Sequence, residues 1–246
     1  MSLDLAGYEK KSKKAIRHFW GQRESASVKN SSSSKRDQGE RGAVTGGKNM
    51  DGFIDLVADV VRANGLRNAE FHVSNQLLTL PGYFRPTKMW DLVITHQGRL
   101  IAAIEFKSHV GPSFGNNFNN RTEEALGTAV DIWTAYREGA FGEATPQPFV
   151  GWLMLLEDAD GSTRPSRLEK TPHFSLFPEF VGASYARRYE ILCEKLVREK
   201  HYTATALLLS SRTKGKSGGY RELSEETGLK QFLARLAAFV AAEAMK

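Results

Sequence analysis

Three residues suited to metal-dependent hydrolysis, Asp91, Glu105 and Lys107, lie around one short apolar stretch. Two apolar runs flank the polar residues 96–99, and such runs around a short Gly-containing loop are typical of a β-hairpin. Glu105 and Lys107 are two positions apart, so on a strand they project from the same face. If the loop is centred on Gly98, Asp91 lies directly across from Glu105. The sequence therefore predicts two carboxylates and an ammonium group at one end of an apolar hairpin.

This grouping of charges suggests a particular chemistry. Charges at the edge of an apolar sheet are costly unless they pair or bind a metal. Two close carboxylates suit Mg²⁺, which takes one or two such ligands and keeps several waters. A neighbouring lysine can stabilise anionic charge or help to deprotonate a bound water. The pattern Asp…Glu-x-Lys therefore predicts a phosphodiester hydrolysis site. The alternative is a solvated face of an amphipathic strand, where Glu-x-Lys is common.

The segment after Lys107, residues 108–121 (SHVGPSFGNNFNNR), is rich in asparagine and glycine. We expect an ordered loop here, neither strand nor helix. Asparagine amides can contact adenine edges, and arginine can contact guanine or phosphate. The candidate DNA-binding residues of this segment are Asn116, Asn117, Asn119, Asn120 and Arg121. The alternative is an Asn-rich turn that hydrogen-bonds only to itself.

Together these segments resemble the XhoI family of type II restriction endonucleases, over residues 39 to about 189. The resemblance is carried by Asp91, Glu105-Phe106-Lys107, GPSFGNNFNNR, EEALG at 123–127, NMDGF at 49–53 and LPGYFRPTK at 80–88. It implies a PD-(D/E)xK nuclease fold, Mg²⁺ as the cofactor, a homodimer and a place in a restriction-modification system. It also implies double-strand cleavage of DNA at the palindrome CTCGAG, with four-base 5′ overhangs.

The resemblance extends to individual residues. It implies Asp91, Glu105 and Lys107 as catalytic residues, and Asp91, Glu105 and the backbone carbonyl of Phe106 as metal ligands. One departure from the wider superfamily pattern is that Trp90, not proline, precedes Asp91. No small-molecule cofactor beyond the metal is expected.

The bulk properties are compatible with a polyanionic partner and indicate no membrane segment. The chain has 246 residues and a formal net charge of +6, and a basic balance fits a polyanionic partner without requiring one. The single cysteine, Cys193, excludes an internal disulfide and a cysteine-built zinc site and favours a reducing cytoplasm. No apolar run is long enough to span a membrane or to serve as a signal-peptide core.

The charge is concentrated at the N-terminus, where the first 50 residues hold 11 Lys/Arg and 5 Asp/Glu. We divide the chain into a basic helix and flexible arm at 1–48 and a catalytic and DNA-binding domain at 49–246. Residues 3–20 are predicted as a helix whose lysines contact phosphate or are simply solvated. Residues 23–48 are too polar to order by burial, so they form a passive linker or an arm that orders on DNA.

Hydrophobic periodicity places the remaining elements and indicates an α/β fold with a mixed central sheet flanked by helices. Helices are expected at 51–63, 121–138, 184–200 and 225–245, and strands at 71–73, 77–80, 149–156 and 203–209. Asn120 is expected to cap the helix at 121–138, and Asp51 is expected to cap the helix at 51–63. Alternatively, Asp51 or Asp55 is a further acid of the metal site.

A second basic segment, residues 210–221 (SSRTKGKSGGYR), follows the last predicted strand. We favour DNA contact by Arg212, Lys214 and Lys216 over a mobile loop, because glycines permit close backbone approach. Two other functions remain open from the residues alone. One is a structure-specific nuclease, such as a junction resolvase, and the other is a non-catalytic DNA-binding module.

Overall fold

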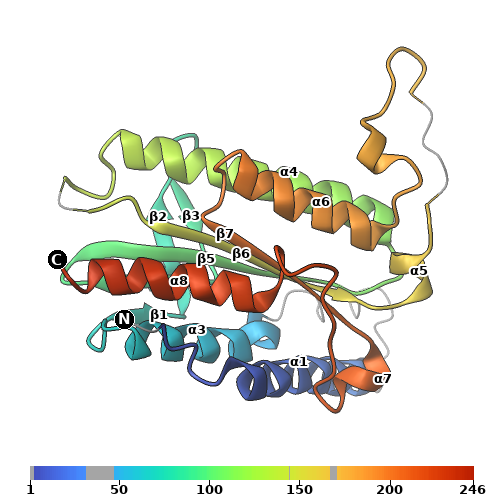
Figure 1. Cartoon of the computed structure of the whole chain (residues 1–246), viewed down its shortest axis with the longest axis horizontal. Coiled ribbons are helices and arrows are strands. Elements are labelled where there is room, and N and C mark those ends of the chain that lie inside the picture. The colour runs from blue at the N-terminus through green and yellow to red at the C-terminus, as the bar shows by residue number, and fades with distance from the viewer. Residues whose placement is uncertain (1–2, 32–46, 144, 167–170) are drawn as a thin grey trace.

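The computed structural model describes residues 3–31, 47–143, 145–166 and 171–246, and its helices cover both faces of a central sheet (Figure 1). The helices are α1 Tyr8–Ser31, α3 Asp51–Ala63, α4 Phe114–Arg137, α5 Asp160–Thr163, α6 Tyr185–Arg198, α7 Arg212–Gly215 and α8 Leu229–Glu243, with 3-10 turns at Gly47–Met50 (η1), Asn75–Leu78 (η2) and Pro178–Phe180 (η3). The strands are β1 Glu70–His72, β2 Thr79–Pro81, β3 Thr87–Met89, β4 Leu92–His96, β5 Arg99–His109, β6 Phe149–Glu157 and β7 Ala204–Ser210.

The sheet has five strands in the order β1-β4-β5-β6-β7, and β2 and β3 form a separate hairpin. β1, β4 and β5 pair antiparallel, whereas β5, β6 and β7 pair parallel. Every residue of β6 is buried, as expected for a parallel strand covered on both faces. The predicted mixed α/β fold is confirmed.

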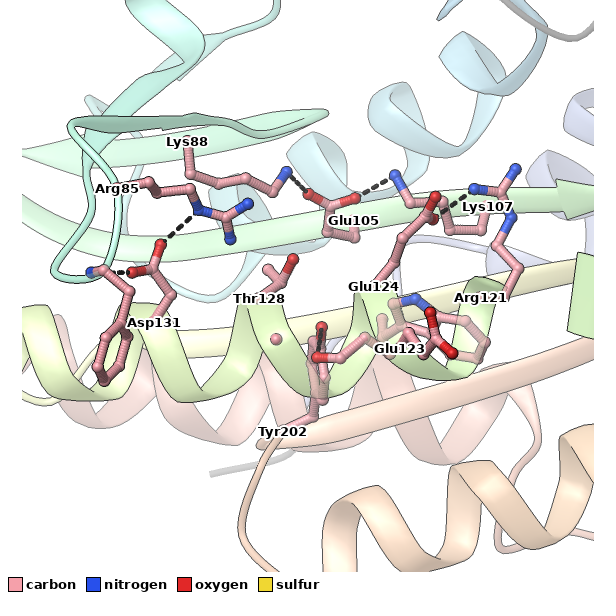
Figure 2. Close-up of a pocket in the computed structure, with 14 residues that line it drawn as sticks. Arg85, Lys88, Glu105, Lys107, Arg121, Glu123, Glu124, Thr128, Asp131 and Tyr202 are labelled. Atoms are coloured by element: carbon pink, nitrogen blue, oxygen red, sulfur yellow. Dashed lines mark hydrogen bonds and ion pairs between the residues drawn. The ribbon is translucent and has the colours of Figure 1, made fainter. Parts of the chain in front are cut away.

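Two hydrophobic cores lie on opposite faces of the sheet. One packs α1, α3 and α8 against residues such as Ile104 and Phe106 of β5. The other packs α4 and α6 against Ala103 of β5 and Trp152 of β6. Successive side chains of a strand point to opposite faces, so Glu105 and Lys107 share the face that α4 covers (Figures 1 and 2).

The N-terminal helix differs from the prediction in extent and in packing. α1 begins at Tyr8 and continues to Ser31, so the linker predicted from residue 23 is wrong up to that point. Ile16, Phe19 and Trp20 are buried in the first core, which gives this helix an apolar anchor that its many lysines obscure in the sequence. The rest of the predicted linker, residues 32–46, lies outside the described residues.

The Asn-rich segment is not the predicted loop. β5 runs on to His109, and α4 begins at Phe114, with Ser113 rather than Asn120 at the N-cap position. Glycine and asparagine are poor helix formers, but Phe114 and Phe118 are one turn apart and both contact the Tyr185 ring. Tertiary packing of this aromatic face outweighs the local propensity.

The helix predicted at 51–63 is present as α3. The structure does not support the roles predicted for its acids, Asp51 and Asp55. Met50 occupies the N-cap position, so the capping role predicted for Asp51 is wrong. α3 also packs on the face of the sheet opposite to Glu105. Within the described residues, no cluster of three His, Cys, Asp or Glu side chains could hold a metal, so neither Asp51 nor Asp55 joins the predicted site.

Candidate active site

A tight turn and a β-bulge set the register of the β4–β5 hairpin. Gln97 and Gly98 both have positive φ, 52° and 73°, the geometry of the two-residue turn that suits a hairpin twist. His96 pairs with Arg99, but Leu92 pairs with Ile104, because the register shifts next to Ile94/Thr95. The bulge in β5 therefore brings Asp91 opposite Glu105. If the pairing of His96 with Arg99 continued along the same sequence without a bulge, Asp91 would lie opposite Ile104 instead.

The three predicted catalytic side chains converge at this end of the hairpin. Lys107 Nζ lies 3.2 Å from Asp91 Oδ2 and forms an ion pair with Glu105 Oε2. Asp91 Oδ2 also accepts a hydrogen bond of 2.8 Å from the Phe106 backbone N–H. The Glu105 side chain is 4% exposed, against 37% for Asp91, so Glu105 lies at the base of the site and Asp91 near its rim.

A fourth charge, Lys88 of β3, completes the site. Its ammonium group pairs with Glu105 Oε1, donates to the Met89 carbonyl and lies 5.2 Å from the centroid of the Trp90 ring. Figure 2 shows the Glu105 carboxylate held between Lys88 and Lys107. The pairing of Lys88 with Glu105 depends on the β2–β3 hairpin folding over β5, which local sequence does not reveal.

The pairing fixes the protonation states of these groups. Burial raises the pKa of Asp91 and the neighbouring Glu105 charge raises it further, against the lowering effect of Lys107. Burial also acts to raise the pKa of Glu105, but Lys107 and Lys88 together hold it below its usual range. Burial opposes the charged form of Lys107, yet its two carboxylate partners raise the pKa of its ammonium group. Lys107 therefore keeps its proton in this arrangement and acts as a hydrogen-bond donor.

Glu105 and Lys107 line a groove of about 540 Å³ between β5 and α4. α4 contributes residues from Arg121 to Asp131, and the β2–β3 hairpin contributes Phe84, Arg85 and Lys88. The groove is charge-balanced, because Arg85 pairs with Asp131 at 2.7 Å and Arg121 pairs with Glu124 at 2.5 Å. Figure 2 shows these pairs on either side of Glu105.

The donor set suits a hard divalent cation. Asp91 and Glu105 offer carboxylate oxygens on one face of the hairpin, and both are paired with ammonium groups. Mg²⁺ needs only one or two carboxylates because it retains water ligands. A divalent ion would replace lysine charge next to these oxygens, so the residues present fit the metal.

The asparagines predicted to read DNA lie on the first turns of α4 and do not behave alike. Asn117 is half-buried, and its amide lies 3.3 Å from His109 Nε2. Asn116, Asn119 and Asn120 are exposed. Arg121 reaches the groove, so only the last of these five residues lines it.

His109, which the sequence analysis did not single out, anchors Asn117. Its Nδ1 lies 2.9 Å from the Tyr189 hydroxyl of α6. Because the Asn117 amide nitrogen can only donate, Nε2 accepts and Nδ1 carries the proton. Burial lowers the pKa of His109 to about 4, so the ring is neutral at pH 7. A histidine at the end of an apolar strand is the only signal in the sequence.

The second basic segment is separate from the groove. Arg212 pairs with Glu157 at 2.7 Å, and Lys216 pairs with Glu24 of α1 at 2.7 Å. Lys214 is exposed. Arg212 and Lys214 belong to α7, which lies beside α1 (Figure 1). The structure therefore does not bring the three predicted contacts together with Asp91, Glu105 and Lys107.

Comparisons with known proteins agree with this geometry. Among the described residues, no helix is long and apolar enough to cross a membrane. No solved structure matches the chain. The chain is 62% identical over 174 residues to the type II restriction enzyme AbrI of Azospirillum brasilense, covering 71% of this chain and 77% of that protein.

Two further relatives cover more of the chain. The type II restriction enzyme XhoI of Xanthomonas vasicola is 52% identical over 198 residues, covering 80% of this chain and 78% of that protein. The type II restriction enzyme BstVI of Geobacillus stearothermophilus is 50% identical over 220 residues, covering 87% and 97%. The family model described as restriction endonuclease XhoI matches residues 29–222. The chain therefore belongs to the XhoI family of restriction endonucleases and is a type II restriction enzyme.

Proposed function

We propose that this enzyme cleaves both strands of DNA at the palindrome CTCGAG in a Mg²⁺-dependent reaction and leaves four-base 5′ overhangs. The target and the overhang are inferred from the family resemblance. The observation that supports the chemistry is the convergence of Asp91, Glu105 and Lys107 beside an open groove.

Asp91 and Glu105 would hold the metal, together with the Phe106 carbonyl. When bound, Mg²⁺ supplies charge stabilisation at the phosphate and activates water for attack. Lys107 contacts both carboxylates, and its ammonium group would donate a hydrogen bond to the attacking water or to a phosphate oxygen. Its position orients that water relative to the phosphate, which is the main protein contribution to phosphoryl chemistry.

We further propose that two copies of the chain bind one target. A palindrome is read most simply by a two-fold symmetric dimer that presents the same residues to each half-site. The exposed Asn116, Asn119 and Asn120 and the groove-lining Arg121 would contact bases or phosphate from α4. Lys214 of α7, which lies beside α1 and outside the groove, would contact phosphate outside the target.

The decisive experiment is digestion of a sequenced plasmid with Mg²⁺, with Ca²⁺ and with EDTA, followed by mapping of the ends. We expect discrete fragments with Mg²⁺ alone, each ending within CTCGAG. Discrete fragments ending elsewhere would replace the target but keep the enzyme class. Cleavage only of branched substrates would instead identify a structure-specific nuclease.

A pair of matched variants separates the site from the fold. Glu105→Gln keeps the side-chain size but removes a metal-binding charge, and we expect cleavage to fall at least about 100-fold. Glu226→Gln makes the same change at an exposed position outside the groove and serves as the control. Equal activity of the two variants would remove Glu105 from the mechanism.

A further inference from the structure

The tip of the β2–β3 hairpin, residues 82–86, is fixed by a buried carboxylate of another element. Asp131 Oδ1 accepts hydrogen bonds of 2.9 Å from the backbone N–H groups of both Tyr83 and Phe84. Its Oδ2 accepts one of 2.7 Å from Arg85 Nε. The Asp131 side chain is only 5% exposed. α4 therefore holds this tip in one conformation.

The space around the tip is equally restricted. The Gly82 N–H donates to the Pro86 carbonyl at 3.3 Å and closes the loop. A Cβ on Gly82 would lie 2.8 Å from Asp131 Oδ2 and 2.6 Å from the Arg85 carbonyl oxygen, so only glycine fits. A loop anchored in this way has little freedom to fold its side chains back onto the protein.

Two aromatic rings nevertheless point into solvent at this tip. Tyr83 is 52% exposed and Phe84 is 69% exposed. The rings contact each other edge to face, with centroids 4.9 Å apart. Exposed rings on a rigid support contribute little to folding, but they lose little conformational entropy when they bind a partner.

The position of the tip identifies that partner. Phe84 and Arg85 line the same groove as Glu105 and Lys107, so a duplex that enters the groove with a phosphate at Glu105 would also meet this tip. We propose that Phe84, supported by Tyr83, inserts between bases or stacks on a base next to the cleaved phosphate. This inference rests on the proposed function for the identity of the substrate. Apolar side chains are known to unstack base steps in this way.

The test measures base stacking and does not depend on cleavage. A duplex carrying the site mapped by the plasmid digest is made with 2-aminopurine in place of the adenine paired across from the cut. Binding is followed with Ca²⁺ and no Mg²⁺, and a gel confirms that the DNA is intact. We expect a several-fold rise in 2-aminopurine emission with the wild-type enzyme, because unstacking relieves quenching.

Phe84→Ala removes the ring from an exposed position, so the variant is expected to fold normally. The emission should then stay at the level of free DNA, and the Kd for the duplex should rise about ten-fold, as expected for the loss of one stacked base. Phe177→Ala is the matched control, because Phe177 is also 69% exposed and lies outside the groove. That variant should match the wild type in both measurements.

A second variant tests the support of the tip. Asp131→Ala leaves both rings in place but removes the acceptor for the two backbone N–H groups, and we expect it to lower the emission as well. Unchanged emission on binding by the wild type, or full emission with Phe84→Ala, would overturn the proposal. Because the mapped site is used, failure of CTCGAG as the target does not affect this result.

Discussion

Lys107 is the residue on which the proposed chemistry most directly depends. Its ammonium group contacts both Asp91 and Glu105, and no other lysine of the described residues pairs with both. The spacing Glu-x-Lys predicted that these two side chains share a face. The partnership with Lys88 was not predictable, because it depends on a hairpin that crosses from outside the main sheet.

We expect Lys107→Ala to lose cleavage by at least about 100-fold while DNA binding is retained. The reason is that the lysine orients water and phosphate but is one of several groups that contact the duplex. Initial cleavage rates with Mg²⁺ and binding anisotropy with Ca²⁺ test the two parts separately. Wild-type turnover would exclude Lys107 from the mechanism.

The asparagines of α4 give a second prediction at this scale. Asn119→Ala removes an exposed amide, so we expect the ratio of affinities for target and random DNA to fall about ten-fold, with unchanged stability. Asn117→Ala instead leaves His109 Nε2 without its donor and should lower the free energy of unfolding by about 1 to 2 kcal/mol.

Binding titrations with both duplexes and denaturant unfolding of both variants compare these effects. An unchanged affinity ratio for Asn119→Ala would argue against base contact from this part of α4. Equal stability of Asn117→Ala and the wild type would show that the contact with His109 contributes little.

At the scale of elements, the ends of β5, α4 and α6 are tied by the buried contacts of His109. The sheet was predictable because buried strands are continuous apolar runs, as in β6. The start of α4 was not, since Asn and Gly favour a loop locally and the deciding contacts come from Tyr185 and Tyr189 of a distant helix.

His109 also makes stability depend on pH. In the unfolded chain a histidine binds a proton near pH 6.5, whereas burial lowers the folded pKa to about 4. Below pH 6.5 the unfolded state therefore binds more protons, so stability falls as the pH falls from about 6.5 to about 4, by up to about 3 kcal/mol. Denaturant titrations at several pH values should show this slope, and His109→Gln should reduce it. An equal slope in both proteins would contradict the assignment.

At the scale of the whole molecule, α1 belongs to the folded domain. Trp20 Nε1 donates to Ser210 Oγ at 3.0 Å, and a Cβ on Gly215 of α7 would collide with the Trp20 ring at 1.9 Å. The basic composition of the N-terminal region led us to expect a separate arm. Composition alone does not show that a few apolar residues among many lysines reach the core.

The single cysteine provides a probe of global unfolding. Cys193 is fully buried on α6, and burial raises the pKa of its thiol far above the usual range, so little reactive thiolate forms. We expect a thiol reagent such as DTNB to label the native enzyme at least about 100-fold more slowly than the urea-unfolded chain. Fast labelling of the native enzyme would show that α6 detaches from the sheet.

The bulge in β5 gives the hairpin one place where its length could change. Removing Ile101 would straighten the strand and still leave Asp91 opposite Glu105, because the two-residue turn alone would then set the register that the bulge now produces. We expect a protein shortened at this residue to be folded and active. One further residue in the same segment would instead place the two acids on opposite faces of the sheet unless a second bulge formed.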